Sequence, residues 1–309
     1  MERLSATLPP PSVGSQVDDI VRNTAFLDSL PIKQANSLLR SKDPNSSHRS
    51  YRKRFRGSLL LSIQYRMHPS IAALPSSIFY DGQLSTPAFL ATQRPFPKVL
   101  NDMMPCENPN LNVRAIDVGG RSNERQGTPT RYSRTVFASG AAPSAVEEQT
   151  TYWNEPEALR VLSLIKDTLR ERNSSDDEIS SIGVISPYNG QVQLIKSMIA
   201  SDKELRDLLL NLPVTLEVKS VDGYQGRERD VVIFSAVRSN RQGNIGFLHD
   251  WRRTNVALTR AKSALLVVAD LQCLADSDRH WAAFSKWATS ARCVVNDSDA
   301  HDDEPSLEV

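Results

Sequence analysis

Two uninterrupted apolar runs, residues 231–237 (VVIFSAV) and 264–269 (ALLVVA), decide the fold class of this chain. Runs of this kind are typical of central parallel strands, because helices cover both faces of such strands and neither face meets water. Shorter strand patterns and helical spacings of apolar residues surround these runs. The strand patterns are 113–118, 182–185 and 216–221, and the expected helices are 70–79, 155–172, 189–200 and 252–262. This order predicts a doubly wound, mainly parallel α/β sheet with helices on both faces.

The composition limits the classes of function. The 309 residues are 39% hydrophobic, which is enough for a substantial core, and 37 Lys and Arg against 36 Asp and Glu give a net charge of +1. A collagen-like, wholly disordered or histone-like chain is therefore excluded, and any nucleic-acid binding must come from a local surface. No run approaches the roughly 20 apolar residues that span a bilayer, and the first residues lack a secretory signal pattern. We therefore expect an intracellular protein, nuclear or cytoplasmic, that is not secreted and has no membrane partner.

Cysteine and histidine offer no metal motif. Cys106, Cys273 and Cys293 are widely spaced without a CxxC pair, and the five histidines form no HExxH. We therefore predict neither a disulfide framework nor a protein-bound metal.

The segments outside the periodic patterns divide the chain. Residues 1–57 contain three consecutive prolines and a basic stretch, 49–56 (RSYRKRFR), whose interleaved aromatics either stack on bases or belong to a solvated loop. Residues 85–112, with five prolines, are expected to be irregular surface, and 119–148, rich in Gly, Ser, Thr and Arg, a long mobile insertion. The acid-rich end is expected to be a disordered tail. The predicted division is 1–57 linker, 58–293 main domain and 294–309 tail.

Four polar segments carry the candidate chemistry: 64–69 (QYRMHP), 182–188 (IGVISPY), 218–230 (VKSVDGYQGRERD) and 252–262 (RRTNVALTRAK). Their basic residues at or near the ends of apolar elements are Arg66, Arg227, Arg260 and Lys262. Ligands of doubly wound sheets bind at the carboxyl ends of strands, and the guanidinium fork suits phosphate oxygens. The alternative for any single arginine is a surface ion pair, and spacing alone does not name the ligand.

Together these segments resemble the C-terminal motor domain of superfamily 1 helicases of the nonsense-mediated-decay and senataxin type. QYRMHP resembles that family's motif IV, SVDGYQGRERD its motif V and RRTNVALTRAK its motif VI, and the resemblance covers residues 58–275. It implies a RecA-like domain, the second of two that bind ATP in the cleft between them. It also implies a motor that moves along single-stranded RNA or DNA and so unwinds paired nucleic acid.

The resemblance implies a role for each matching residue. Arg66 and Arg260 would be arginine fingers that reach the γ-phosphate of ATP. Tyr65 would lie against the adenine, and Glu228 would accept a hydrogen bond from the ribose, with Gly226 letting the backbone approach. For Tyr65, a place in the core is the alternative.

The resemblance also implies a contact with the nucleic acid. The Ser220 hydroxyl would donate to a phosphate of the strand, whereas the alternative is a hydroxyl that only caps a turn. Met67, His68 and Pro69 are expected to be structural, and Asn255 is expected to fix the helix of RRTNVALTRAK.

The first motor domain of the family is missing from the sequence. The chain has no G-x-x-x-x-G-K-[ST] phosphate loop, and no Asp-Glu pair ends an apolar strand before QYRMHP. Leu8-Pro9-Pro10 resembles the end of motif III, with Thr7 in place of its glutamine. We therefore expect the Mg²⁺ ligands to come from the first domain, and the chain alone to hydrolyse little ATP.

Two other classes of function stay open. One is a non-enzymatic nucleic-acid-binding or regulatory module derived from a helicase. The other is an unrelated α/β enzyme, which the absence of GxSxG and of a Gly-rich βα turn disfavours.

Overall fold

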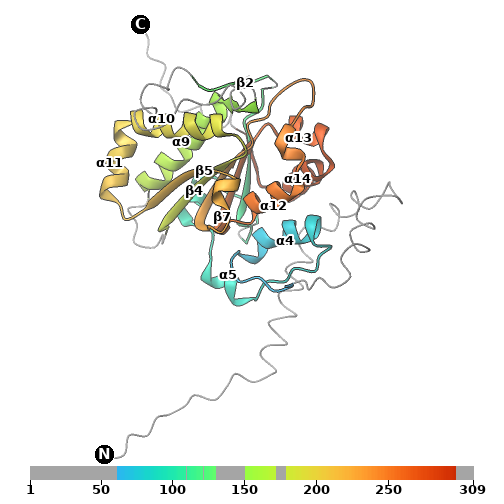
Figure 1. Ribbon diagram of the computed structural model, residues 1–309. Coiled ribbons are helices and arrows are strands. Elements are labelled where there is room, and N and C mark those ends of the chain that lie inside the picture. The colour runs from blue at the N-terminus through green and yellow to red at the C-terminus, as the bar shows by residue number, and fades with distance from the viewer. Residues whose placement is uncertain (1–60, 109, 121, 130–149, 172–178, 297–309) are drawn as a thin grey trace, which may run out of the picture.

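A six-stranded sheet in which all neighbouring strands are parallel forms the centre of the molecule, with the order β5-β4-β6-β7-β1-β8 (Figure 1). The computed structural model describes residues 61–108, 110–120, 122–129, 150–171 and 179–296. The strands are β1 Val113–Asp117, β4 Ser181–Ser186, β5 Thr215–Ser220, β6 Arg229–Ser235, β7 Ala261–Ala269 and β8 Val294–Asn296.

Helices cover both faces of this sheet (Figure 1). One face packs against α6 (Lys98–Met103), α9 (Glu155–Arg170), α10 (Asn189–Ser201) and α11 (Lys203–Asn211). The other face packs against α4 (Pro69–Phe79), α12 (Trp251–Leu258), α13 (Leu271–Ser277) and α14 (Arg279–Ser290). The predicted doubly wound α/β fold is thus confirmed, with the architecture of a RecA-like domain.

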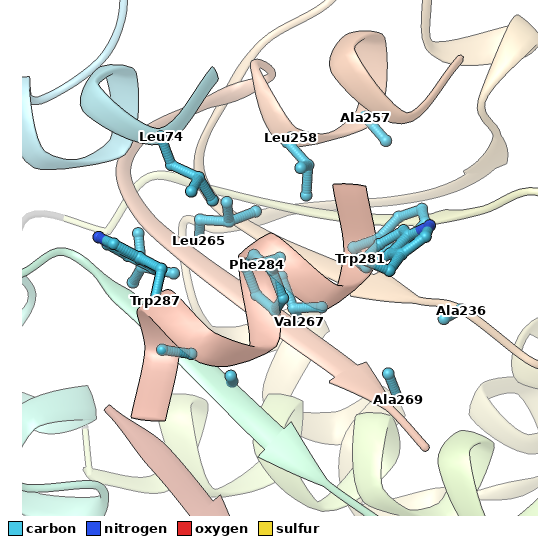
Figure 2. Packing of buried hydrophobic residues seen from close by; sticks show 14 of the residues in the cluster. Leu74, Ala236, Ala257, Leu258, Leu265, Val267, Ala269, Trp281, Phe284 and Trp287 are labelled. Carbon is cyan, nitrogen blue, oxygen red and sulfur yellow. The ribbon is translucent and has the colours of Figure 1, made fainter. Parts of the chain in front are cut away.

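Strand β7 shows why the apolar runs are uninterrupted. Leu265 and Val267 point into the core beside α14, whereas Leu266 and Val268 point into the core beneath α9. Figure 2 shows the first of these cores, where the α14 rings Trp281, Phe284 and Trp287 gather around the strand. Because both faces are dry from Ala264 to Ala269, every position in this part of the strand is apolar.

The helix expected at 252–262 is shorter than predicted. Helix α12 ends at Leu258, and Ala261 and Lys262 already belong to strand β7. The backbone N–H of Arg229 donates to the carbonyl of Arg260 at 3.1 Å, and Ala261 pairs with Arg229 across the strands. Because the end of the segment pairs with β6, it forms a strand instead of extending the helix. Arg260 therefore lies in a two-residue link between α12 and β7.

The segment 85–112 is not simply irregular surface. It contains helices α5 (Phe89–Gln93) and α6, and it buries Leu100 and Met104. No proline lies inside either helix, and Pro97 is the N-cap of α6.

The expected boundaries at 119–148 and 294–309 also shift. Strand β2 (Glu124–Gln126) pairs antiparallel with β3 (Tyr152–Asn154), so the start of the expected mobile insertion is ordered. Residues 294–296 form edge strand β8 instead of beginning the tail. The basic stretch 49–56, residues 130–149 and the acidic residues 297–304 lie outside the described residues.

A short crossover over β4 depends on one glycine. Residues 221–228 run from the carboxyl end of β5 to the amino end of β6, and Tyr224 within them is fully buried. A Cβ on Gly183 of β4 would stand 2.0 Å from the Tyr224 hydroxyl oxygen. Only glycine leaves room for the Tyr224 ring over the sheet at this point.

Gly183→Ala is expected to lower the free energy of unfolding by about 1–3 kcal/mol, because the added methyl must displace the Tyr224 ring. Urea unfolding monitored by circular dichroism measures the change. Gly223→Ala is the matched control, since its nearest side-chain atom would be 3.4 Å away, and it is expected to change stability far less. Equal effects of the two substitutions would contradict this account of the crossover.

Candidate functional site

Arg66 and Arg260 meet at the amino ends of β6 and β7. The Nε of Arg66 donates to Oε2 of Glu228 at 2.7 Å, and its Nη1 donates to the carbonyl of Thr259, the residue before Arg260, at 3.2 Å. The backbone N–H of His68 donates to the Lys262 carbonyl at 2.8 Å. These bonds place the QYRMHP segment beside the start of β7.

The Arg260 guanidinium is fixed by the end of helix α12 and the residue that follows it. Its Nε donates to the Val256 carbonyl at 2.8 Å, and its Nη2 donates to the Thr259 hydroxyl at 3.2 Å. Burial, and then the neighbouring Arg66 cation, lower the pKa of Arg260. The side chain remains partly exposed and charged, because an arginine does not deprotonate in a protein.

Carboxylates moderate the positive charge of this group. The hydrogen bond from Arg66 is the main reason that the pKa of Glu228 lies below its usual value. The Lys262 ammonium is 3.6 Å from Oε1 of Glu228 and 3.7 Å from Oδ1 of Asp230. We call Arg66, Arg94, Glu228, Asp230, Arg260 and Lys262 the arginine cluster. Its four cations outnumber its two carboxylates, so it retains positive charge for an anionic ligand.

Arg94 is a member of this cluster that sequence reasoning missed. Its guanidinium donates to the backbone carbonyl of Arg66 and, at 3.3 Å, to that of Tyr65. Its own carbonyl accepts a hydrogen bond of 3.0 Å from the Asn112 side chain. Arg94 lies in the proline-rich stretch expected to be irregular surface, so no pattern marked it.

Tyr65 and Gly226 lie on the segments that form the cluster. The Tyr65 side chain is 61% exposed, so the core alternative is wrong and its ring is available to a ligand. Gly226 has φ +76°, and nothing lies within 4 Å of where a Cβ would stand, so its need for glycine is conformational. The Arg227 backbone carbonyl accepts a hydrogen bond of 3.5 Å from Nη1 of Arg260, but the Arg227 guanidinium is outside the cluster and pairs with Glu217 at 2.7 Å.

Met67, His68 and Asn255 make internal contacts, in keeping with the structural role expected of them. Met67 and His68 are buried, and burial lowers the pKa of His68 to about 4, so its ring stays neutral. The Asn255 amide donates to the Tyr80 hydroxyl at 2.8 Å and ties α12 to the end of α4.

Ser220 does not join the arginine cluster. Ser220 lies at the edge of the sheet formed by the carboxyl ends of the strands, whereas the cluster lies at the edge formed by their amino ends. Ser220 ends β5 level with Ser186, whereas the cluster surrounds Arg229 at the start of β6. Six strand residues separate these levels by about 20 Å. Arg66 and Arg260 do lie near the ends of strands, as expected, but these are the amino ends, because GRE and LTRA lead into strands rather than out of them.

A pocket of about 330 Å³ opens at the Ser220 edge. The Ser220 hydroxyl oxygen accepts a hydrogen bond of 3.3 Å from the Gly223 N–H, so it does cap a turn, and its own O–H can still donate. The lining residues include Thr128, Thr151, Tyr188, Asn189, Gln193, Ser220, Asp222, Phe247 and Arg253. Hydroxyl, amide and aromatic groups thus dominate this pocket.

Known proteins match most of the chain. The family described as AAA domain matches residues 46–272. The DNA polymerase alpha-associated DNA helicase A of Saccharomyces cerevisiae is 32% identical over 229 residues, 74% of this chain and 30% of the relative. A regulator of nonsense transcripts 1 homolog of Arabidopsis thaliana is 35% identical over 69% of this chain and 14% of its own length. Helicase sen1 of Schizosaccharomyces pombe is 32% identical over 76% of this chain and 12% of its own length.

The chain belongs to the superfamily 1 helicases of the nonsense-mediated-decay and senataxin type. It therefore carries an ATP-dependent helicase domain, and it spans between 12% and 30% of the length of the three relatives named above.

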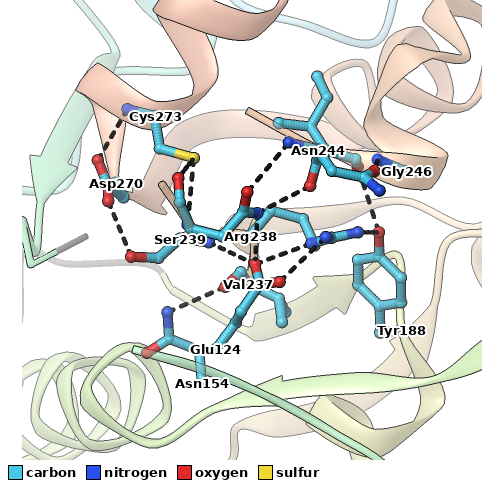
Figure 3. Close-up of polar contacts among 12 residues, drawn as sticks. Glu124, Asn154, Tyr188, Val237, Arg238, Ser239, Asn244, Gly246, Asp270 and Cys273 are labelled. Atoms are coloured by element: carbon cyan, nitrogen blue, oxygen red, sulfur yellow. Dashed lines mark hydrogen bonds and ion pairs between the residues drawn. The ribbon is translucent and has the colours of Figure 1, made fainter. Parts of the chain in front are cut away.

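A buried polar network supports the pocket of this helicase domain (Figure 3). Arg238 pairs with Glu124 at 2.9 Å, and its Nη1 donates to the Tyr188 hydroxyl at 3.2 Å. The Ser239 hydroxyl is 2.8 Å from the Asp270 carboxylate. Arg238 follows the VVIFSAV run in the sequence, but nothing in the sequence pattern indicated that Glu124 would form an ion pair with it.

Glu157 is the most deeply buried acid of the network. Its carboxyl group accepts hydrogen bonds from the Ser235 hydroxyl at 2.6 Å and from the Val237 N–H at 2.8 Å. Val237 has φ +75°, which strains a β-branched residue, so these bonds help to fix the turn that leads to Arg238. Burial raises the pKa of Glu157 to about 8.

Among the described residues, no group of three or more His, Cys, Asp and Glu could hold a metal ion. No helix of the described chain is long and apolar enough to cross a membrane.

The raised pKa of Glu157 predicts a pH dependence of stability. The carboxyl is protonated in the folded domain up to about pH 8, whereas the unfolded chain titrates near 4.5. The folded state therefore binds the extra proton, and stability should decline as the pH rises from about 4.5 to about 8 and then level off. Thermal melts of Glu157→Gln, which cannot titrate, should lack this component. An identical pH profile for both proteins would contradict the assignment.

Proposed function

We propose that this chain is the second motor domain of an ATP-dependent helicase that moves along single-stranded RNA or DNA. The observation that supports it best is the contact between Arg66 and the segment of Arg260, which are 193 residues or more apart in sequence and share one partly exposed face. A single surface ion pair would not require both arginines, a lysine and Arg94 to gather at one edge.

The arginine cluster suits a triphosphate held by a first motor domain. Guanidinium groups bind phosphate oxygens bidentately, and the excess of cations favours a polyanion. ATP, bound with Mg²⁺ ligands from the first domain, would supply the phosphoryl group that is transferred. Arg66 and Arg260 would then stabilise charge on that group as arginine fingers, an effect worth about 10³–10⁵ in rate.

The hydrogen bonds of the cluster preorganise these fingers. Glu228 and the Thr259 carbonyl orient Arg66, and the Val256 carbonyl orients Arg260, so little reorganisation is needed when a phosphate arrives. Tyr65, exposed beside Arg66, would face the adenine, and Glu228 would offer its second oxygen to the ribose. The positive φ of Gly226 shapes the turn that presents Glu228.

Ser220 would bind a phosphate of the nucleic acid at the opposite edge. The segment 221–228 connects it directly to Glu228, and the buried Tyr224 fixes that segment to the sheet. A displacement at one edge is therefore transmitted to the other through eight residues. This connection is the physical basis we propose for coupling hydrolysis to movement along the strand.

The test joins this chain to a first motor domain taken from the matched DNA helicase A of Saccharomyces cerevisiae. Arg260→Ala is expected to reduce nucleic-acid-stimulated ATP turnover by about 10³-fold or more, and Arg66→Ala by a similar factor, because each removes a cation from the transferred phosphoryl group. Weak binding of a non-hydrolysable ATP analogue should persist. Phosphate release measures the turnover.

Arg227→Ala is the matched control, because Arg227 pairs with Glu217 outside the cluster. It should leave most of the turnover intact. If Arg66→Ala and Arg260→Ala are no worse than this control while the chain still binds single-stranded nucleic acid, the non-enzymatic module is the better description.

A further inference from the structure

Phe247 places an exposed aromatic ring in the pocket that contains Ser220. The Phe247 residue is 43% exposed, and among the large apolar residues that are exposed in the described chain it alone lines this pocket. A single exposed apolar ring is common on protein surfaces, so the case for a ligand rests on the contacts that hold this ring at the pocket.

A row of aromatic and cationic groups holds the ring. The Arg253 guanidinium carbon lies 4.8 Å from the Phe247 ring centre, and the centre of the Tyr188 ring lies 5.6 Å from it, with the two rings tilted by 48°. Tyr188 packs edge-on against Tyr152 at 5.4 Å, and Arg238 lies 4.2 Å over Tyr152. Only the Phe247 end of this row is substantially open to the pocket.

The turn before Phe247 is fixed by the buried network. Gly246 has φ +52°, and a Cβ there would stand 2.7 Å from both Nη1 of Arg238 and the hydroxyl of Tyr188 (Figure 3). The Tyr188 hydroxyl also donates to the Ile245 carbonyl at 3.2 Å. The backbone therefore has one arrangement at this point, and it presents the ring to the pocket.

The pocket has too little positive charge to bind a nucleic acid through its phosphates alone. Arg253 is the only Lys or Arg among the described lining residues, and it pairs with Asp222 at 3.0 Å. The lining instead offers hydroxyls, amides and the Phe247 ring. This chemistry suits the face of a nucleobase beside a sugar-phosphate chain, since aromatic side chains stack on bases in sites that bind single strands.

We propose that Phe247 stacks on a base of the single strand whose neighbouring phosphate is bound by Ser220. This inference rests on the proposed function and adds a second kind of contact to it. Every base offers a π-face, so stacking on Phe247 would grip the strand without reading its sequence, as a motor requires. Arg253 and Tyr188 are positioning residues that keep the ring at its angle.

The experiment compares two oligonucleotides of about 12 units, oligothymidine and the same sugar-phosphate chain without bases. Fluorescence anisotropy measures their binding to the 309-residue chain. Phe247→Ala is expected to weaken oligothymidine binding by about 5- to 100-fold and to leave the abasic chain unchanged. Phe247→Trp should preserve binding, whereas Phe247→Leu, which keeps an apolar side chain without a flat ring, should behave like Phe247→Ala.

Ser220→Ala supplies the contrast, because loss of a phosphate contact should weaken both oligonucleotides by the same factor. Melting temperatures of the Phe247 variants close to that of the parent exclude unfolding. The stacking proposal is overturned if Phe247→Leu binds oligothymidine as tightly as the parent, or if Phe247→Ala weakens the binding of both oligonucleotides equally. Neither result would bear on the proposed contact between Ser220 and a phosphate. If the parent chain binds neither ligand, the proposed function itself fails.

Discussion

The ion pair between Arg66 and Glu228 is the interaction on which the candidate nucleotide site depends, since it joins residues 162 positions apart at the amino ends of β6 and β7. Four cations at this edge would repel one another without Glu228 and Asp230 between them. The Arg94 guanidinium, which donates to the Arg66 carbonyl, and the His68 N–H, which donates to the Lys262 carbonyl, give the same segments further support. Such redundancy is what electrostatic preorganisation requires.

The sheet separates two chemistries. One edge gathers guanidinium groups that suit a triphosphate, and the other carries a hydroxyl and aromatic pocket that suits a single strand. The segment 221–228 is short because it crosses β4 directly, and it can cross there only because Gly183 leaves space for Tyr224. The buried Glu157 and the Arg238–Glu124 pair give the pocket edge a rigid support.

The fold could be predicted, and the candidate site residues could be named, because their signals are local. Continuous apolar runs mark the central strands, and QYRMHP and LTRA mark Arg66 and Arg260 by resemblance to a family. The contributions of Arg94, Glu124 and Glu157 arise from partners 28 to 114 residues away, and no periodicity encodes such contacts. Whether a residue lies at the amino or the carboxyl ends of the strands depends on whether its segment enters or leaves a strand. The two cases differ by a shift of two or three residues, which helix and strand patterns do not resolve.

The central claim is that the arginine cluster acts on a triphosphate that a separate domain holds. The most direct measurement is ATP hydrolysis by the purified 309-residue chain with single-stranded RNA or DNA, compared with the same chain joined to a first motor domain. The account predicts turnover only in the joined protein, because the chain contributes cations and no phosphate loop. Stimulated turnover by the chain alone would contradict it.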